Sequence, residues 1–115
     1  MAQLSDTRIY PIVEGRQVRL QVEIGNGQAG GSSIIWEGTI TEVFDQPFTV
    51  PLGGETLQFK TLHCATVVRD VSPDTNRTIV TYHLTGGIED RDYPYAMEVE
   101  EHGGHAKYLV DFVFV

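Results

Sequence analysis

The stretch that decides the fold is Gln17-Val18-Arg19-Leu20-Gln21-Val22-Glu23-Ile24, because its polar and apolar residues alternate without a break. A period of two places all the apolar side chains on one face of an extended chain and all the polar ones on the other. The same alternation recurs in other segments, whereas no segment shows the 3.6-residue period of an amphipathic helix. The stretch therefore predicts a strand with one buried face in an all-β protein.

The segments on either side of this stretch extend the pattern. Arg8 to Val13 reads as a strand at a sheet edge, because Pro11 has no amide hydrogen to give to a neighbouring strand. Gly25 to Gly31 contains four glycines in seven residues and predicts a loop. Ile34 to Phe44 then predicts one strand, in which Gly38 marks a bulge or leaves room for a neighbouring ring. Four apolar residues are expected on one face of that strand: Ile34, Trp36, Ile40 and Phe44.

Two hairpins are predicted in the second half of the chain. The turn-forming residues from Ser72 to Asn76 would join two paired strands, one carrying His63 and the other carrying His83. Gly103-Gly104 would form a two-residue turn that places Tyr95 opposite Phe112.

Strand number and spacing indicate the architecture. Seven or eight strands in 115 residues predict a single domain over 1–115, an antiparallel β-sandwich with an immunoglobulin-like topology. A small closed β-barrel is the alternative. A hydrophobic content of 41% is sufficient for one core of ordinary size.

Charge and composition exclude several classes of partner. The 8 basic and 16 acidic residues give a formal charge of −8. Phosphate backbones and anionic membranes attract clustered Lys and Arg, so we expect neither nucleic acid nor a membrane as a partner. A basic protein partner would suit this charge. A single cysteine excludes an internal disulfide, and a start without a basic and apolar leader predicts a cytoplasmic protein. A chain whose leader had already been removed would instead be exported.

No residue pattern predicts catalysis or a cofactor. His63 and Cys64 are neighbours on a strand, so their side chains point to opposite faces and cannot form a catalytic pair. Cys64 shares a face with apolar residues and is expected to be a small buried hydrophobe. The pattern Gly25-x-Gly27-x-x-Gly30 is followed by a predicted strand, which excludes the dinucleotide-binding turn because that turn needs a helix. We therefore expect a protein that is not an enzyme.

One metal site is predicted at the last hairpin. His102 and His105 flank the Gly103-Gly104 turn and should lie opposite each other, with Glu100 one step further along the same face. Two imidazoles and a carboxylate would suit zinc, copper or nickel.

The C-terminal run Leu109-Val110-Asp111-Phe112-Val113-Phe114-Val115 predicts an interface. Alternation buries one set of its side chains, yet Leu109, Val113 and Val115 are apolar on the other face. A strand that is apolar on both faces is either covered on both sides or meets a partner. Tyr93, at the start of another strand, is expected to be exposed and to add to a binding surface. Self-association through the C-terminal strand is one form such an interface would take.

Three functions remain open from the sequence. The first is a non-enzymatic protein-binding or accessory module that uses loops or a sheet face. The second is an acidic neutraliser of a basic protein, as immunity proteins are, and the third is a metal-dependent binder of a small molecule or carbohydrate. The segment from Thr66 to Gly87, with its Ser-Pro-Asp-Thr-Asn and Leu-Thr-Gly-Gly stretches, resembles small bacterial sandwich proteins but implies no activity.

Overall fold

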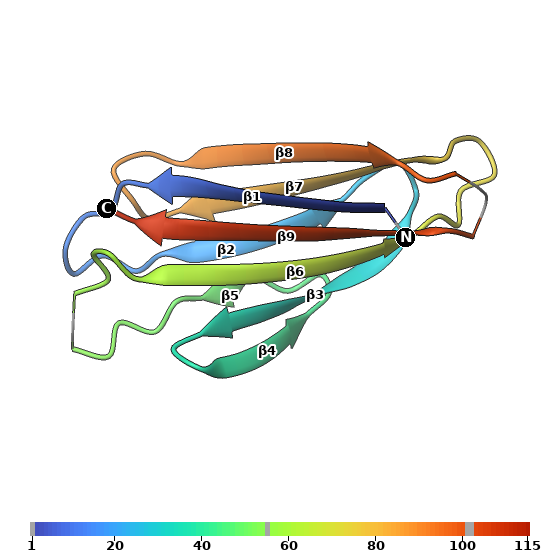
Figure 1. The fold of residues 1–115 in the computed structure, drawn as a ribbon. Helices are drawn as coiled ribbons and strands as arrows, with labels where there is room; N and C mark the ends of the chain where they lie inside the picture. Colours follow the sequence, from blue (N-terminus) through green and yellow to red (C-terminus); the bar gives the residue numbers. More distant parts are fainter. Residues whose placement is uncertain (1, 55, 101–102) are drawn as a thin grey trace.

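The fold is all-β in a computed structural model, which describes residues 2–54, 56–100 and 103–115. Nine strands are formed within these ranges (Figure 1). Their bounds are β1 Ala2–Tyr10, β2 Arg19–Ile24, β3 Ala29–Trp36, β4 Thr39–Val43, β5 Phe48–Thr49, β6 Thr61–Arg69, β7 Arg77–Thr85, β8 Arg91–Glu98 and β9 His105–Phe114. No helix in the described residues is long and apolar enough to cross a membrane.

The strands form two sheets that pack face to face as a β-sandwich. One sheet has the order β1-β9-β6-β3-β4 and the other the order β5-β2-β7-β8. The two sheets are consistent with the predicted sandwich, although nine strands form in the described residues instead of seven or eight, and the closed barrel is excluded because the two sheets remain separate. The pairing is antiparallel except at one edge, where β1 runs parallel to β9 from Ala2 opposite Ala106 to Tyr10 opposite Phe114.

The immunoglobulin-like topology is not confirmed. In that topology the last two strands of the domain are neighbours in one sheet. Here the last two strands lie in different sheets, because β8 pairs with β7 whereas β9 pairs with β6 and β1.

Both predicted hairpins are wrong for the same reason. Tyr95 pairs with Val80 of β7, and Phe112 pairs with Leu62 of β6, so β8 and β9 do not form a hairpin. The segment Ser72–Asn76 likewise crosses between the sheets instead of joining paired strands, because β6 and β7 belong to different sheets. Along β8 and β9 the side chains alternate between the core and the outside as expected. Such alternation does not determine which strand is the neighbour, because several pairings bury the same face.

Two strands form where the sequence favoured other structure. Ala29–Gly31 begins β3 although it belongs to the glycine-rich stretch. The glycine at position 30 is needed there, because a Cβ on Gly30 would lie 2.3 Å from the Val67 carbonyl oxygen of the neighbouring strand β6. The predicted single strand from Ile34 to Phe44 is the hairpin β3–β4, so the prediction of one shared apolar face is wrong: Ile34 and Trp36 are buried, whereas Ile40 and Phe44 are exposed. Its turn is Glu37-Gly38, and both residues have a positive φ (48° and 78°), as a type I′ turn requires.

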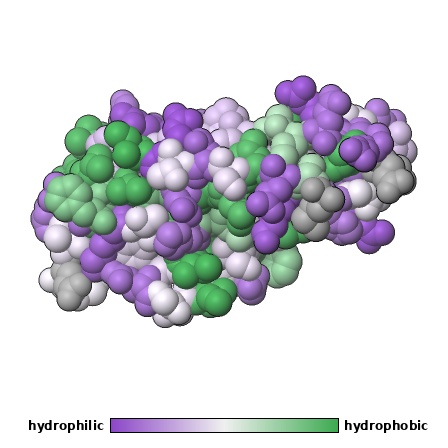
Figure 2. Space-filling model, in the orientation of Figure 1, coloured by the Kyte–Doolittle hydropathy of each residue, from purple (hydrophilic) through white to green (hydrophobic). Residues whose placement is uncertain are grey.

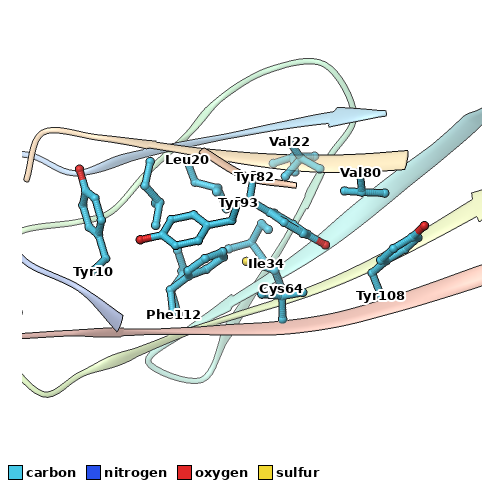
Figure 3. Close-up of a cluster of buried hydrophobic side chains, with 14 of the residues drawn as sticks. Tyr10, Leu20, Val22, Ile34, Cys64, Val80, Tyr82, Tyr93, Tyr108 and Phe112 are labelled. Carbon is cyan, nitrogen blue, oxygen red and sulfur yellow. The ribbon is translucent and has the colours of Figure 1, made fainter. Parts of the chain in front are cut away.

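The core lies between the two sheets and is rich in aromatic residues (Figure 3). Tyr82 and Phe112 face each other across it with ring centroids 5.6 Å apart. Cys64 is buried there, as predicted, and burial raises the pKa of its thiol. Buried hydroxyls are paired: Thr66 Oγ1 lies 2.6 Å from Tyr82 Oη and 2.8 Å from Ser32 Oγ. Such pairing lets polar groups occupy an apolar core without a large desolvation cost.

Edge strand β1 is held in place by tyrosines of β8. Tyr95 Oη donates a hydrogen bond to Asp6 Oδ2 (2.7 Å), and Tyr93 Oη donates to the Ile9 carbonyl (3.1 Å). The Arg8 guanidinium lies over the Tyr93 ring, 5.1 Å from its centroid. These contacts join the two sheets along one side of the sandwich and fix β1 beside β9. The predicted edge position of the first strand is confirmed, although the strand ends before Pro11.

Candidate functional site

The candidate site is the outer face of the five-stranded sheet. Strand β9 lies between the edge strand β1 and the central strand β6, so its outward side chains are flanked by neighbouring strands on both sides. One set of β9 residues is buried in the core, and the other set points outward and is half-buried, including Leu109 and Val113. Within the described residues no further layer covers this face (Figure 1). The end of β9 from Leu109 to Phe114 therefore carries apolar side chains on both sides but is covered on only one, and the outward row of the whole strand also includes His105, Lys107 and Asp111.

Other strands bring more apolar side chains to the same face. Ile9 of β1 is 58% exposed, Ile40 of β4 is 63% exposed, and Phe44, just beyond β4, is also 63% exposed. Ile35 of β3 is half-buried and pairs with Ile40 across the sheet. Figure 2, drawn from this side, shows apolar side chains in several patches with polar side chains between them. The outer face is thus a mixed surface rather than one continuous apolar patch.

The Phe44 ring lies next to Gly31 of β3, which has no Cβ to obstruct it. A Cβ built on Gly31 of β3 would lie 2.7 Å from the Phe44 ring, closer than side chains tolerate. The glycine in the strand therefore allows the aromatic ring to rest against the backbone of β3 while the other side of the ring stays in solvent. An exposed aromatic ring held in one position is a favourable anchor for a partner, because little side-chain entropy is lost on binding.

His63 and Asp111 form a polar pair at the centre of the face. They are register partners on β6 and β9, and His63 Nδ1 lies 2.8 Å from Asp111 Oδ1. The pair lines a hollow of about 640 Å³ together with small side chains such as Ala65 and Ser5. No serine, threonine or cysteine side chain in the described residues is hydrogen-bonded to His63. The pair can accept or donate hydrogen bonds to a ligand on this face.

Two of the predicted interface residues lie on this face. Leu109 and Val113 point outward from β9, as expected. Val115 follows β9 at the end of the sandwich, where its N–H donates to the Tyr10 carbonyl (3.1 Å) and its own carbonyl accepts from Ile12 (3.0 Å). Val115 therefore belongs to the junction with β1 rather than to the centre of the face.

The prediction that Tyr93 is exposed is wrong. Its side chain is 3% exposed, and its ring packs against Phe112 at a centroid distance of 5.0 Å. The alternation of β8 points Tyr93 into the core, and its hydroxyl reaches β1 instead of solvent. Tyr93 thus supports the sandwich from inside and takes no part in a surface.

The predicted metal site loses the hairpin on which it depended. His102 lies outside the described residues. Glu100 is exposed in the connection between the sheets, and His105 begins β9 opposite Arg69, a cation that would repel a metal ion. Gly103 and Gly104 do not form a β8–β9 turn but hydrogen-bond to the backbone of Asp70. Among the described residues, no group of three or more His, Cys, Asp or Glu side chains is placed to hold a metal ion.

The opposite outer face, on the four-stranded sheet, carries a second polar cluster. His83 Nδ1 lies 2.5 Å from Asp92 Oδ1, and His83 Nε2 lies 3.2 Å from Glu23 Oε1. The hydrogen bond to Asp92, with that to Glu23, raises the pKa of His83 against the opposing effect of burial. Because His63 belongs to the other sheet, the two histidines do not share a face, and the expected pairing of their strands is wrong.

A second hollow, of about 510 Å³, opens between edge strands β4 and β5. Its apolar wall includes Trp36, Phe48 and Leu52, and Lys60 Nζ and Glu37 Oε1 form an ion pair of 2.6 Å beside them. This hollow was not predicted, because the strand expected from Ile34 to Phe44 ran through Glu37-Gly38 without a turn. The Glu-Gly dipeptide between two alternating stretches was the available turn signal.

Comparisons with known protein families, with characterised proteins and with solved structures found nothing that this chain matches.

Proposed function

We propose that this chain is a non-enzymatic protein-binding module that uses the outer face of its five-stranded sheet. The observation that carries the proposal is the position of β9, which packs one apolar row into the core and presents Leu109 and Val113 at the centre of an uncovered face. An uncovered sheet face that carries apolar side chains between polar ones has the composition of a protein interface, which favours a surface that is covered in a complex.

The composition of the face suits a protein partner. Protein interfaces combine apolar anchors with polar groups that can form hydrogen bonds, and this face offers Phe44 and Ile40 beside the His63–Asp111 pair. Its formal charges balance. The basic residues are Arg69 of β6 and Lys107 of β9, and the acidic residues are Glu42 of β4 and Asp111 of β9. The contacts made by this face alone should therefore depend on apolar burial and respond weakly to salt.

A matched pair of variants tests the proposal. Leu109→Arg places a long cation at the centre of the outer face, and Thr81→Arg places the same side chain on β7, in the outward row of the other sheet. The tagged chain and both variants are used to capture partners from a lysate of the source organism, after circular dichroism has verified the fold. A stoichiometric partner should be retained by the wild type and Thr81→Arg and reduced at least tenfold by Leu109→Arg. Equal retention by both variants would refute the outer face as the binding surface.

Two other outcomes distinguish the alternatives. A basic partner that Leu109→Arg still captures, and that dissociates steeply with added salt, would support the charge-driven neutraliser instead. Sedimentation of the pure chain tests self-association: if the wild type is oligomeric and Val113→Asp is a folded monomer, a second copy covers this face. If Val113→Asp leaves the mass of an oligomer unchanged, the oligomer forms elsewhere.

A further inference from the structure

Strand β4 has a free edge with backbone groups available for pairing. In the described part of the chain, β4 pairs with β3 alone. Trp36 and Thr39 flank a two-residue turn and so form a hydrogen-bonded pair, after which the two kinds of pair alternate along an antiparallel ladder. The backbone of Thr41 is therefore directed to β3, whereas that of Ile40 and Glu42 is directed to the free edge.

The side chain of Gln46 already occupies part of the position beside β4 that a further strand would take. Gln46 Oε1 accepts a hydrogen bond from the Phe44 N–H (3.0 Å), and Gln46 Nε2 donates to the Glu42 carbonyl (3.4 Å). The side-chain amide thus acts as a peptide group would if a further strand lay beside β4. An incoming strand needs to displace only this one exposed side chain at that end of the edge.

The inner side of the same edge opens onto the hollow of about 510 Å³ described above. Thr39 and Thr41 of β4 line it with short side chains, which leaves the space in front of Trp36 and Phe48 unfilled. The outer side of the edge carries the exposed Ile40. A strand beside β4 would therefore meet apolar surface on both of its faces.

Charge indicates which occupant suits this edge. Residues 37–46 contain three carboxylates, Glu37, Glu42 and Asp45, and no lysine or arginine. Glu37 is in an ion pair with Lys60, so Glu42 and Asp45 are the carboxylates that give this edge its acidic character. A second copy of the chain would add another acidic strand and a second formal charge of −8, which opposes pairing of β4 with itself. A basic segment would be attracted.

We propose that β4 receives an extended basic segment of the partner protein as an additional strand. Strand addition to an exposed sheet edge takes its affinity from main-chain hydrogen bonds and its specificity from alternate side chains. The outward side chains of the added strand would be Lys or Arg beside Ile40 and Glu42, and its inward side chains would be apolar and enter the hollow beside Trp36. This inference rests on the proposed function and specifies the chemistry of the partner.

The test uses synthetic peptides and the single tryptophan of the chain as the reporter. The probe is an end-blocked seven-residue peptide in which lysine alternates with valine, titrated against the full chain while Trp36 fluorescence is recorded. The peptide is expected to pair antiparallel to β4, with its lysines opposite Ile40 and Glu42, so that the lysine amides face β4 and the valine amides face away. N-methylation of the lysine amides should therefore weaken binding at least tenfold, whereas N-methylation of the valine amides should leave it within threefold. Equal effects of the two modifications, or no saturation below about 1 mM, would overturn the inference.

Variants of the chain provide the second arm. Thr41→Phe fills the hollow and Glu42→Lys reverses the charge at the edge. Each should weaken the binding of the unmodified peptide at least tenfold. Thr81→Phe makes the same substitution as Thr41→Phe on the other sheet and should have no effect. Glu42→Lys changes an exposed side chain, so it remains informative if Thr41→Phe does not fold.

Failure of this inference can be distinguished from failure of the proposed function. If a captured partner is lost with Leu109→Arg but the peptide does not bind, the strand-addition inference is wrong and the outer face stands. If the peptide binds as described and Leu109→Arg retains the partner, β4 is a binding site and the outer face is not.

Discussion

Replacement of Gln28 by alanine should destabilise the protein by about 3 kcal/mol, because this single side chain joins two connections at one end of the sandwich. Gln28 is 9% exposed. Its Oε1 accepts hydrogen bonds from the backbone N–H groups of Val71 (2.8 Å) and Ser72 (2.9 Å). Its Nε2 donates to the carbonyls of Thr75 (3.3 Å) and Arg77 (3.2 Å).

The magnitude follows from those four contacts. Each of the two N–H groups left unpaired costs about 1 kcal/mol at the lower limit for a buried donor, and each of the two longer bonds contributes about 0.5 kcal/mol, which gives the loss of about 3 kcal/mol. Unfolding a chain of 115 residues has an entropy of about 240 cal/mol/K, so a loss of about 3 kcal/mol should lower the Tm by about 12 °C.

Urea unfolding followed by Trp36 fluorescence measures the free energy directly. The matched control is Gln58→Ala, which removes the same atoms from an exposed turn residue and should change stability by less than about 0.5 kcal/mol. A loss below about 1 kcal/mol for Gln28→Ala would refute the reasoning, since it would mean that water replaces the side chain at no cost.

Three further predictions concern the core of the sandwich and the polar cluster around His83. Because the pKa of His83 is raised above 6.5 in the folded state, its pairing with Asp92 should stabilise the protein fully below about pH 6.5, and this stability should be lost as pH rises through the folded-state pKa. Urea unfolding at a series of pH values should show a decline that is absent in His83→Gln; parallel curves would contradict it. Tyr82→Phe removes the hydroxyl bonded to Thr66 and should cost about 1–2 kcal/mol in thermal unfolding, whereas an unchanged Tm would mean that the bond contributes nothing net. Cys64 is 2% exposed, and burial raises the pKa of its thiol, so a thiol reagent should modify it only at the rate of unfolding; rapid labelling of the native chain would show that the core opens locally.

Within single strands, the alternation of residues was a reliable guide. Leu20 and Val22 of β2 and Cys64 of β6 are buried as their patterns indicate, because the facing of a side chain depends only on the parity of its position in a strand. Which strands pair depends on contacts between distant segments. Between β8 and β9, the Gly103-Gly104 dipeptide has the composition of a hairpin turn. Nothing in the local sequence indicates that these glycines instead hydrogen-bond to Asp70, which follows β6.

The candidate site was predictable only in part. Leu109 and Val113 could be found because their strand is apolar on both faces. Ile9, Ile40 and Phe44 join them only through the strand order β1-β9-β6-β3-β4, which brings together the two ends of the chain and its middle. β1 itself carries a weak pattern, since most of its side chains are exposed at a sheet edge.

The parallel pairing of β1 with β9 has a mechanical consequence. Because the two strands run in the same direction, the start of β1 and the end of β9 lie at opposite ends of a molecule 46 Å long (Figure 1). A force that pulls Ala2 and Val115 apart would slide the two strands along each other, so the hydrogen bonds of the whole ladder would bear the load together rather than one after another. This domain should therefore resist stretching between its ends far better than peeling of β8 from its sheet.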